Sequence, residues 1–448
     1  MVDDMNAPSA RIGADAAGTL ISRLVILAAG LVTNIVVART IGPEGKGLLS
    51  YLSYMLFLVM TLGGIGLQTA AIHNLGKGLF RKETVAGTQI VLSILAGLAC
   101  AAAVLLLLPR LQGKIVLPPG LLLALLPILV LAIVQINGSG VMIGLGCIAT
   151  HNRISLLGPL LWAAASVIAL VLLRRDATFA AYAWLLTQIA APIATIAWLA
   201  RHARPSRDRM RACARSSLRF GIDAYVANLL WALMLRLDGF LLGAMRGAER
   251  VGYYSVAVLL AELLWYFPSS LTLAMSRRMS ADREEAALAL ACRASRVGLW
   301  FVASGSVAIA IAAVPVILLI YGEAFLPAAR PLWILLPGVT AIAVAKPLSL
   351  YYTQQKGSPR VNAALSAIAV GTNLLLNLLW IPRHGPSGAA AASTVAYSLL
   401  ALLLFLRIRR EPGFAWKNAL LLRQDDLVAA LVTVRAVIPF GKRKEGAP

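Results

Sequence analysis

The sequence has 448 residues, of which 60% are hydrophobic and only 13% are charged, and its formal net charge is +22. Soluble domains average about 45–50% apolar and about 25% charged residues, so this composition excludes a soluble globular protein and indicates a surface that faces lipid. The Lys and Arg residues lie between apolar segments, where they can set topology and contact anionic lipid headgroups. No basic cluster is interleaved with aromatic residues on a polar face, which excludes nucleic acid as an expected partner.

Apolar segments of about 20 residues, the length that crosses a bilayer core, recur along the chain. The first sixteen residues are polar, and the apolar segment after them leads directly into a second one, so we expect a retained first helix and no cleaved signal peptide. Runs such as 101–108 lack the alternation of barrel strands, which favours helices. An all-α membrane protein with about twelve transmembrane helices is predicted, with spans at 17–38, 47–72, 85–108, 120–145, 154–173, 178–200, 218–243, 251–275, 296–320, 329–353, 360–381 and 386–407.

Loop charges predict the orientation. If the N-terminus is cytoplasmic, the cytoplasmic loops carry the excess of Lys and Arg, as the positive-inside rule requires, and most of it lies in the loop 201–217. An even number of spans places the C-terminus on the same side, in agreement with the basic tail 408–448. We therefore expect a multi-pass protein of the bacterial inner membrane with both termini in the cytoplasm. Within the tail, residues 414–440 are predicted as either an amphipathic surface helix or a mobile segment.

A short motif occurs twice, at an offset of 205 residues. Its copies are Gly42-x-Glu44-x-x-Gly47-x-x-Ser50 and Gly247-x-Glu249-x-x-Gly252-x-x-Ser255. Six spans separate them, so the two halves have the same orientation, as in a parallel repeat that places a substrate cavity between two lobes. We predict two pseudo-symmetric six-helix lobes, at 1–200 and 218–407, which the basic linker 201–217 connects. Chance recurrence of glycine-rich turns is the alternative reading.

Three cations lie inside predicted spans, where ionisable residues are costly and usually face a cavity. Arg23 is close enough to the cytoplasmic end for its side chain to reach the interface instead, whereas Arg236 and Lys346 are deeper. A cationic cavity suits an anionic group such as a lipid pyrophosphate, which Arg binds in a bidentate manner and Lys as a point charge. Arg23, Arg236 and Lys346 are thus the candidate ligands of a substrate pyrophosphate.

The acids and amides inside the spans have two interpretations each. Glu262 is predicted either to pair with Arg236 or Lys346 or to carry a proton during transport, because burial raises a carboxyl pKa. Asp238 is predicted to anchor the turn or a neighbouring helix, with a coupling-ion role left open. Hydrogen bonding between helices is the first interpretation for the in-span amides and sugar contact is the second. These amides are Asn34, Gln68, Asn373 and Asn377. Tyr351 and Tyr352 are expected at the membrane interface.

Several chemistries have no matching pattern. A P-loop is absent, and the only adjacent aspartates, Asp3-Asp4 and Asp425-Asp426, are near the termini. The four cysteines are not spaced for a metal or a disulfide framework. We expect no enzyme, no cofactor and no bound metal.

At three places the sequence resembles Wzx-type polysaccharide exporters of the multidrug/oligosaccharidyl-lipid/polysaccharide superfamily. Segment 37–47 resembles their first-loop motif, and 236–255 resembles their span 7–8 region. The C-terminal half matches best, at 321–325, 331–332 and 380–390. The likeness covers about residues 12–407.

The resemblance implies a MATE-like, V-shaped arrangement of twelve helices that works by alternating access. The implied activity is a flippase for polyprenyl-pyrophosphate-linked repeat units of O-antigen, capsule or exopolysaccharide, driven by an ion gradient and working beside other polysaccharide-assembly membrane proteins. An ion-coupled multidrug antiporter of the same superfamily is the alternative. Two further readings are the peptidoglycan-precursor flippase branch, whose members usually have additional helices, and a scaffold for synthesis enzymes.

Overall fold

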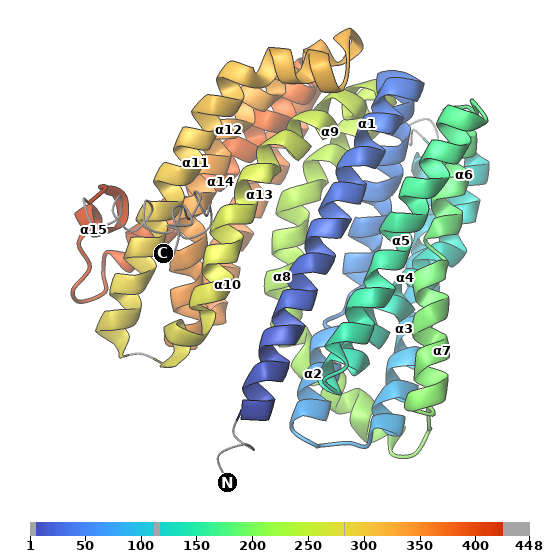
Figure 1. Ribbon diagram of the computed structural model, residues 1–448, viewed down its shortest axis with the longest axis vertical. Coiled ribbons are helices and arrows are strands. Elements are labelled where there is room, and N and C mark those ends of the chain that lie inside the picture. Colours follow the sequence, from blue (N-terminus) through green and yellow to red (C-terminus); the bar gives the residue numbers. More distant parts are fainter. Residues whose placement is uncertain (1–5, 112–116, 282, 424–448) are drawn as a thin grey trace, which may run out of the picture. The chain divides into compact units, whose positions relative to one another are not determined.

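The computed structural model describes residues 6–111, 117–281 and 283–423, and every regular element in these ranges is helical (Figure 1). This confirms the all-α class. The helices are α1 (Asn6–Gly64), α2 (Leu67–Gly76), α3 (Lys82–Leu111), α4 (Pro119–Gly144), α5 (Ile148–Ser166), α6 (Ala177–Thr187), α7 (Ala190–His202), α8 (Met210–Arg246), α9 (Ala248–Glu262), α10 (Tyr266–Ala281), α11 (Glu284–Ile320), α12 (Ala329–Leu350), α13 (Pro359–His384), α14 (Pro386–Ile408) and α15 (Trp416–Leu420).

Eleven helices in the described ranges are long and apolar enough to cross a membrane, and the first of them covers two predicted spans. That helix, Gly18–Gly64, has 47 residues. Its backbone is not helical at Gly42, where φ is 64° and ψ is −170°. The Lys46 Nζ donates to Asn34 Oδ1 at 2.6 Å, although 12 residues of straight helix span about 18 Å. The chain therefore turns back at Gly42, and α1 consists of an outgoing arm and a returning arm.

Short 3-10 or π-helical segments interrupt the α-helix in three spans, and two of these segments lie close to a proline. A 3-10 segment, Leu263–Trp265, separates α9 from α10 and ends three residues before Pro268. Proline lacks an N–H group and its ring clashes with the carbonyl four residues earlier, here that of Leu264, which explains the break. A π-helical segment, Tyr351–Gln355, continues α12 beyond Pro347, and another, Val167–Leu172, continues α5. These breaks do not alter the number of spans.

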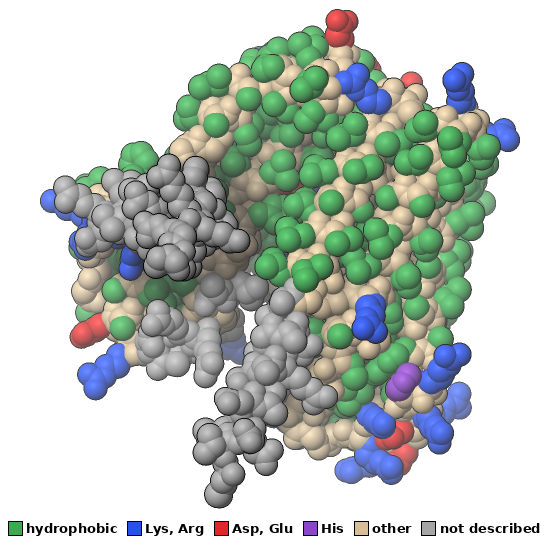
Figure 2. Space-filling model, in the orientation of Figure 1, with side chains coloured by type: hydrophobic (Ala, Val, Ile, Leu, Met, Phe, Trp, Pro, Cys, Tyr) green, Lys and Arg blue, Asp and Glu red, His purple; other side chains and the backbone are tan. Residues whose placement is uncertain are grey.

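The surface of the helices is apolar, as a lipid-facing protein requires. Several large hydrophobic side chains are highly exposed, such as Leu106 at 75%, Ile311 at 78% and Leu319 at 79% exposure. The space-filling view shows hydrophobic side chains over the middle of the helices, whereas Lys and Arg side chains gather mainly near their ends (Figure 2). The protein is thus a multi-pass membrane protein.

The chain forms two compact units, and several helices contribute residues to both. The first unit comprises Met1–Ala257, Ala313–Pro331 and Val370–Ala392. The second comprises Val258–Ala312, Leu332–Ala369 and Ser393–Pro448. The boundaries of the predicted six-helix lobes stay a prediction.

The basic linker 201–217 is packed onto the first unit. Ala203 and Cys213 are fully buried in a cluster with Val85 of α3 and Leu199 of α7. The Ser206 backbone N–H donates to the Glu83 carbonyl at 2.8 Å. Burial raises the pKa of the Cys213 thiol. The linker therefore holds its arginines at a fixed place, at the ends of α3 and α7.

After α14 the described chain continues through the short helix α15 to residue 423. Of the region predicted as a surface helix or a mobile segment, only residues 414–423 lie in the described part, and they contain one helix of five residues. Residues 424–440 lie outside the described residues.

Candidate functional site

The two copies of the repeat motif pack against each other in the first unit. Gly42 (φ 64°, ψ −170°) and Gly247 (φ 86°, ψ 174°) have matching backbone conformations of the kind that glycine adopts readily. A Cβ atom built on Gly47 would lie 1.7 Å from the Ala248 carbonyl oxygen, and one on Gly252 would lie 2.0 Å from the Pro43 carbonyl oxygen. The contact is therefore reciprocal, and it brings backbone against backbone with no room for a side chain.

Both the backbone conformation and the packing contact are repeated in the two copies, which supports a true sequence repeat over chance recurrence of glycine-rich turns. Equivalent glycines, 205 positions apart, turn the chain in the same way and then approach the equivalent turn of the other copy. Close approach through small residues is the usual way in which membrane helices pack tightly. The repeat contact, defined as residues 42–50 with 247–255, joins the turn of α1 to the junction of α8 and α9.

Two arginines beside the repeat contact cap other helices of the first unit. Arg39 donates to the last carbonyls of α11, at 2.9 Å to Ile320 and also to Leu319. Arg246 donates to the Pro382 carbonyl of α13 at 2.8 Å. A cation at a helix C-terminus satisfies free carbonyls and complements the helix dipole. The arginines thus fasten the ends of α11 and α13 to the repeat contact.

Lys46, inside the motif, is a residue that the sequence reasoning missed. Its side chain is 6% exposed and donates to Asn34 Oδ1 at 2.6 Å and to Ser50 Oγ at 3.4 Å. Its position counted as a loop because the predicted span began at residue 47. The returning arm instead begins at Pro43, and proline at the first turn of a helix was the available signal.

Arg236 and Asp238 lie two residues apart on α8 but face different partners. The Arg236 guanidinium lies over the Tyr54 ring, 5.9 Å from its centroid, and donates to its neighbouring carbonyl. Asp238 is buried and accepts a 2.5 Å hydrogen bond from the Tyr254 hydroxyl of α9. The prediction that Asp238 anchors a neighbouring helix is confirmed. Its coupling-ion role stays a prediction.

Lys346 is the centre of a polar cluster in the second unit. Its ammonium donates to Ser269 Oγ of α10 at 2.7 Å and lies 5.3 Å from the centre of the Trp265 ring. The predicted pairing of Glu262 with Lys346 stays a prediction. The Trp265 indole also donates to the Val339 carbonyl and packs edge-on against Tyr397. A cation, a hydroxyl and an aromatic face thus meet inside membrane-spanning helices.

The remaining candidates are placed as follows. Arg23 is exposed on the outgoing arm of α1. Gln68 of α2 donates to Ser139 of α4 at 2.9 Å, which is a bond between helices. Asn373 and Asn377 are fully buried on one face of α13, and the Asn377 amide donates to Asn373 Oδ1 at 2.8 Å. Gln68 thus bonds to another helix and Asn34 to the other arm of α1, whereas the bond between Asn377 and Asn373 lies within α13. Contact of the four amides with sugar stays a prediction.

The expectation that Tyr351 and Tyr352 face the membrane interface is wrong, because both are packed inside the protein. Both side chains are buried, at 0% and 1% exposure, and their hydroxyls donate to Glu284 at 3.3 Å and Glu411 at 3.1 Å. These acids are distant in sequence, so no local pattern could reveal the pairing.

Comparison with known proteins identifies the family. Residues 12–276, more than half of the chain, match the family described as "Polysaccharide biosynthesis protein". No curated protein matches the sequence. Among solved structures, the lipid II flippase MurJ in an inward closed conformation has a TM-score of 0.73 at 14% identity and covers 94% of this chain and 93% of its own.

Transporters of the MATE family are also similar. An inward-facing multidrug resistance MATE transporter of the MOP superfamily has a TM-score of 0.67 at 19% identity, with 87% of this chain and 97% of the other covered. The Vibrio cholerae transporter VcmN in its bent form has a TM-score of 0.57 at 15% identity, with 90% and 98% covered. The predicted all-α, MATE-like fold is confirmed, and the chain belongs to the polysaccharide biosynthesis protein family.

Proposed function

We propose that the protein is a flippase that moves polyprenyl-pyrophosphate-linked oligosaccharide from the cytoplasmic to the periplasmic leaflet of a bacterial inner membrane. Its family acts in polysaccharide biosynthesis, and the structurally similar MurJ is a flippase for another lipid-linked substrate, lipid II. The product would be O-antigen, capsule or exopolysaccharide. The transported lipid, the anionic membrane lipids and other polysaccharide-assembly membrane proteins are its proposed partners.

The repeat contact carries the mechanistic part of the proposal. At this contact, backbone packs directly on backbone at Gly47 and Gly252, which holds the helix ends together. The loop charges assign this end to the periplasm, because the turn of α1 follows a single span from a cytoplasmic N-terminus. In alternating access, a cavity between lobes 1–200 and 218–407 opens outward only after the two copies separate. Glycine suits such a seal because it lets two backbones meet and part without side chains to repack.

The cations supply the proposed recognition of the substrate. Lys346 donates to the Ser269 hydroxyl and lies against the Trp265 ring, and a phosphate oxygen would be a stronger acceptor for its ammonium than a neutral hydroxyl. Arg236 can turn its guanidinium from the Tyr54 ring to a second phosphate oxygen. Arg23, exposed on α1, would meet the headgroup first. Glu262, which also lies within a predicted span, is the proposed residue for coupling transport to an ion gradient.

Multidrug antiport is the second candidate, because MATE transporters share the fold. A site for cationic drugs requires uncompensated acid inside the spans. Here the spans also hold the cations Arg236 and Lys346, which a site for cationic drugs would not contain. The described charges therefore favour an anionic cargo.

Complementation of a deletion strain tests the proposal. Surface polymer and lipid-linked repeat units are measured with wild type, Lys346→Ala, Arg236→Ala and the control Arg201→Ala at an exposed arginine of the linker, at matched membrane levels. Wild type and the control should restore polymer, whereas the two in-span variants should accumulate lipid-linked units. Normal export by both in-span variants would refute the binding site and leave a scaffold role, and normal export by the deletion strain would refute the flippase.

A further inference from the structure

The chain after α14 is held against the second unit instead of leaving it. We call residues 409–423 the strap. The strap begins directly after the span Pro386–Ile408 and contains α15. Two separate sets of hydrogen bonds, one at each end of the strap, attach it to the other helices of this unit.

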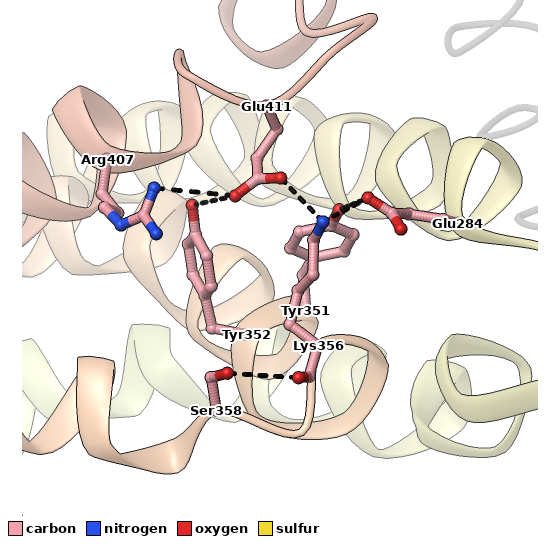
Figure 3. A network of polar contacts seen from close by, with 7 residues as sticks. All are labelled: Glu284, Tyr351, Tyr352, Lys356, Ser358, Arg407 and Glu411. Carbon is pink, nitrogen blue, oxygen red and sulfur yellow. Dashed lines mark hydrogen bonds and ion pairs between the residues drawn. The ribbon is translucent and has the colours of Figure 1, made fainter.

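The first attachment is Glu411, the centre of a charge-balanced network (Figure 3). Its carboxylate pairs with Lys356 at 2.8 Å and with Arg407 at 3.7 Å, and it accepts a 3.1 Å hydrogen bond from Tyr352. Lys356 also pairs with Glu284 at the start of α11. The Glu411 side chain is only 10% exposed, so salt screens its bonds less than those of a fully exposed ion pair.

The second attachment is to the side of α11. The Arg296 guanidinium donates to the Asn418 carbonyl, and the Trp300 indole donates to the Leu420 carbonyl at 2.9 Å. Ala419 between them is fully buried. The backbone of α15 is therefore fixed in register against one turn of α11.

This turn of α11 is where the helix enters the membrane. Charged residues occur from Arg283 to Arg296, and residues 297–320 contain none. Twenty-four residues of helix span about 36 Å, which is enough for the hydrocarbon core. The charge-free stretch of α14 likewise ends just before Arg407. Two helices thus place the strap at the boundary between hydrocarbon and headgroups.

The side chains that the strap leaves exposed fit that boundary. Trp416 is 51% exposed, and Leu421 and Leu422 are 46% and 39% exposed. The exposed charged residues of the strap are all basic, since its one acid, Glu411, is used internally. They are Arg409, Arg410, Lys417 and Arg423. Tryptophan beside clustered Lys and Arg is the pattern of a surface that binds anionic lipids.

We propose that the strap is a binding site for the headgroups of anionic phospholipids, preformed by its attachments to α11 and Lys356. Each basic residue near an anionic surface favours the bound state by about fivefold. Arg409, Arg410 and Lys417 together would contribute on the order of 100-fold. This inference does not rest on the flippase proposal.

The test uses the full chain with its native cysteines replaced and a Leu421→Cys reporter that carries an environment-sensitive dye. The protein is placed in nanodiscs of phosphatidylcholine with increasing phosphatidylglycerol. The dye emission should shift as phosphatidylglycerol increases, because headgroups that bind to the strap displace water around the reporter. Neutralising Arg409, Arg410 and Lys417 to Gln should weaken this response by on the order of 100-fold.

The matched control neutralises three exposed arginines of the linker, Arg201, Arg207 and Arg211, and should keep the wild-type response. Thermal unfolding verifies that both variants are folded. A wild-type dye signal that ignores lipid charge would overturn the proposal. An equal loss of response in the linker control would also overturn it, because the effect would then belong to net charge and not to the strap.

Discussion

Replacing Gly47 with alanine should open the repeat contact. The added Cβ would lie 1.7 Å from the Ala248 carbonyl oxygen, and Cβ atoms essentially never come closer than 3.0 Å to such an atom. The two copies must therefore move apart by about 1.3 Å, and because the obstacle is backbone, no rotation of a side chain can relieve the clash. Gly30→Ala, on the same helix α1, is the matched control, since its Cβ would meet nothing within 4 Å.

The size of the effect follows from the cost of overpacking, which is about 1–3 kcal/mol. At 1.4 kcal/mol per factor of ten, the closed state loses between about 5-fold and about 150-fold of its population relative to states in which the copies are apart. Gly252→Ala, where the added Cβ meets the Pro43 carbonyl oxygen at 2.0 Å, should produce a shift in the same range.

A buried reporter measures this shift. Ser255 lies within the repeat contact and is 7% exposed. A Ser255→Cys variant without native cysteines is treated in cells with a membrane-impermeant maleimide, and the rate of labelling is followed. Labelling should be slow in the reporter background and with Gly30→Ala, and about 5-fold to 150-fold faster with Gly47→Ala. Equal labelling rates for Gly47→Ala and Gly30→Ala, at equal membrane levels, would refute the claim that the repeat contact holds the closed state together.

Two further predictions concern bonds described above. Tyr254→Phe removes the hydrogen-bond donor to the buried Asp238 carboxylate and should cost about 1–3 kcal/mol of stability. The control Tyr253→Phe loses a hydrogen bond within its own helix and should lower the Tm in detergent less. Equal losses of Tm would contradict the anchoring role of Asp238. The Glu284 and Glu411 carboxylates raise the pKa of Lys356 above its ordinary 10.5, so the attachment is present below that value and is lost only as pH rises through the raised pKa. Protease cleavage of the strap should therefore be constant from about pH 6 to about pH 9 and increase at every pH with Lys356→Gln, whereas a change within this range in wild type would contradict the assignment.

The sequence predicted the spans because a crossing helix needs only a window of apolar residues, which is a local property. The repeat was predictable for a related reason, since the turn at Gly42 and at Gly247 each requires a residue without a Cβ atom. The spacing of these glycines gave the offset of 205 residues, and the structure adds that the copies meet.

What the sequence could not predict depends on partners distant along the chain. Tyr351 resembles an interface tyrosine by its position, but Glu284, 67 residues away, makes it a buried member of a polar network. Lys46 resembles a loop cation, but the helix that contains it begins four residues before the start of the apolar segment. Its ammonium donates a hydrogen bond to Asn34 of the other arm. The pairings of Lys346 with Ser269 and Trp265 likewise arise only from packing.

Direct transport by the purified protein is the measurement that tests the central claim. The protein is reconstituted into vesicles with a polyprenyl-pyrophosphate-linked oligosaccharide, and an external glycosidase reports which leaflet holds the sugar. A flippase predicts that sugar from the inner leaflet becomes accessible with wild type and much more slowly with Lys346→Ala, while a control phospholipid stays in place. If wild type leaves the inner-leaflet sugar protected, with and without an imposed ion gradient, the flippase assignment is contradicted.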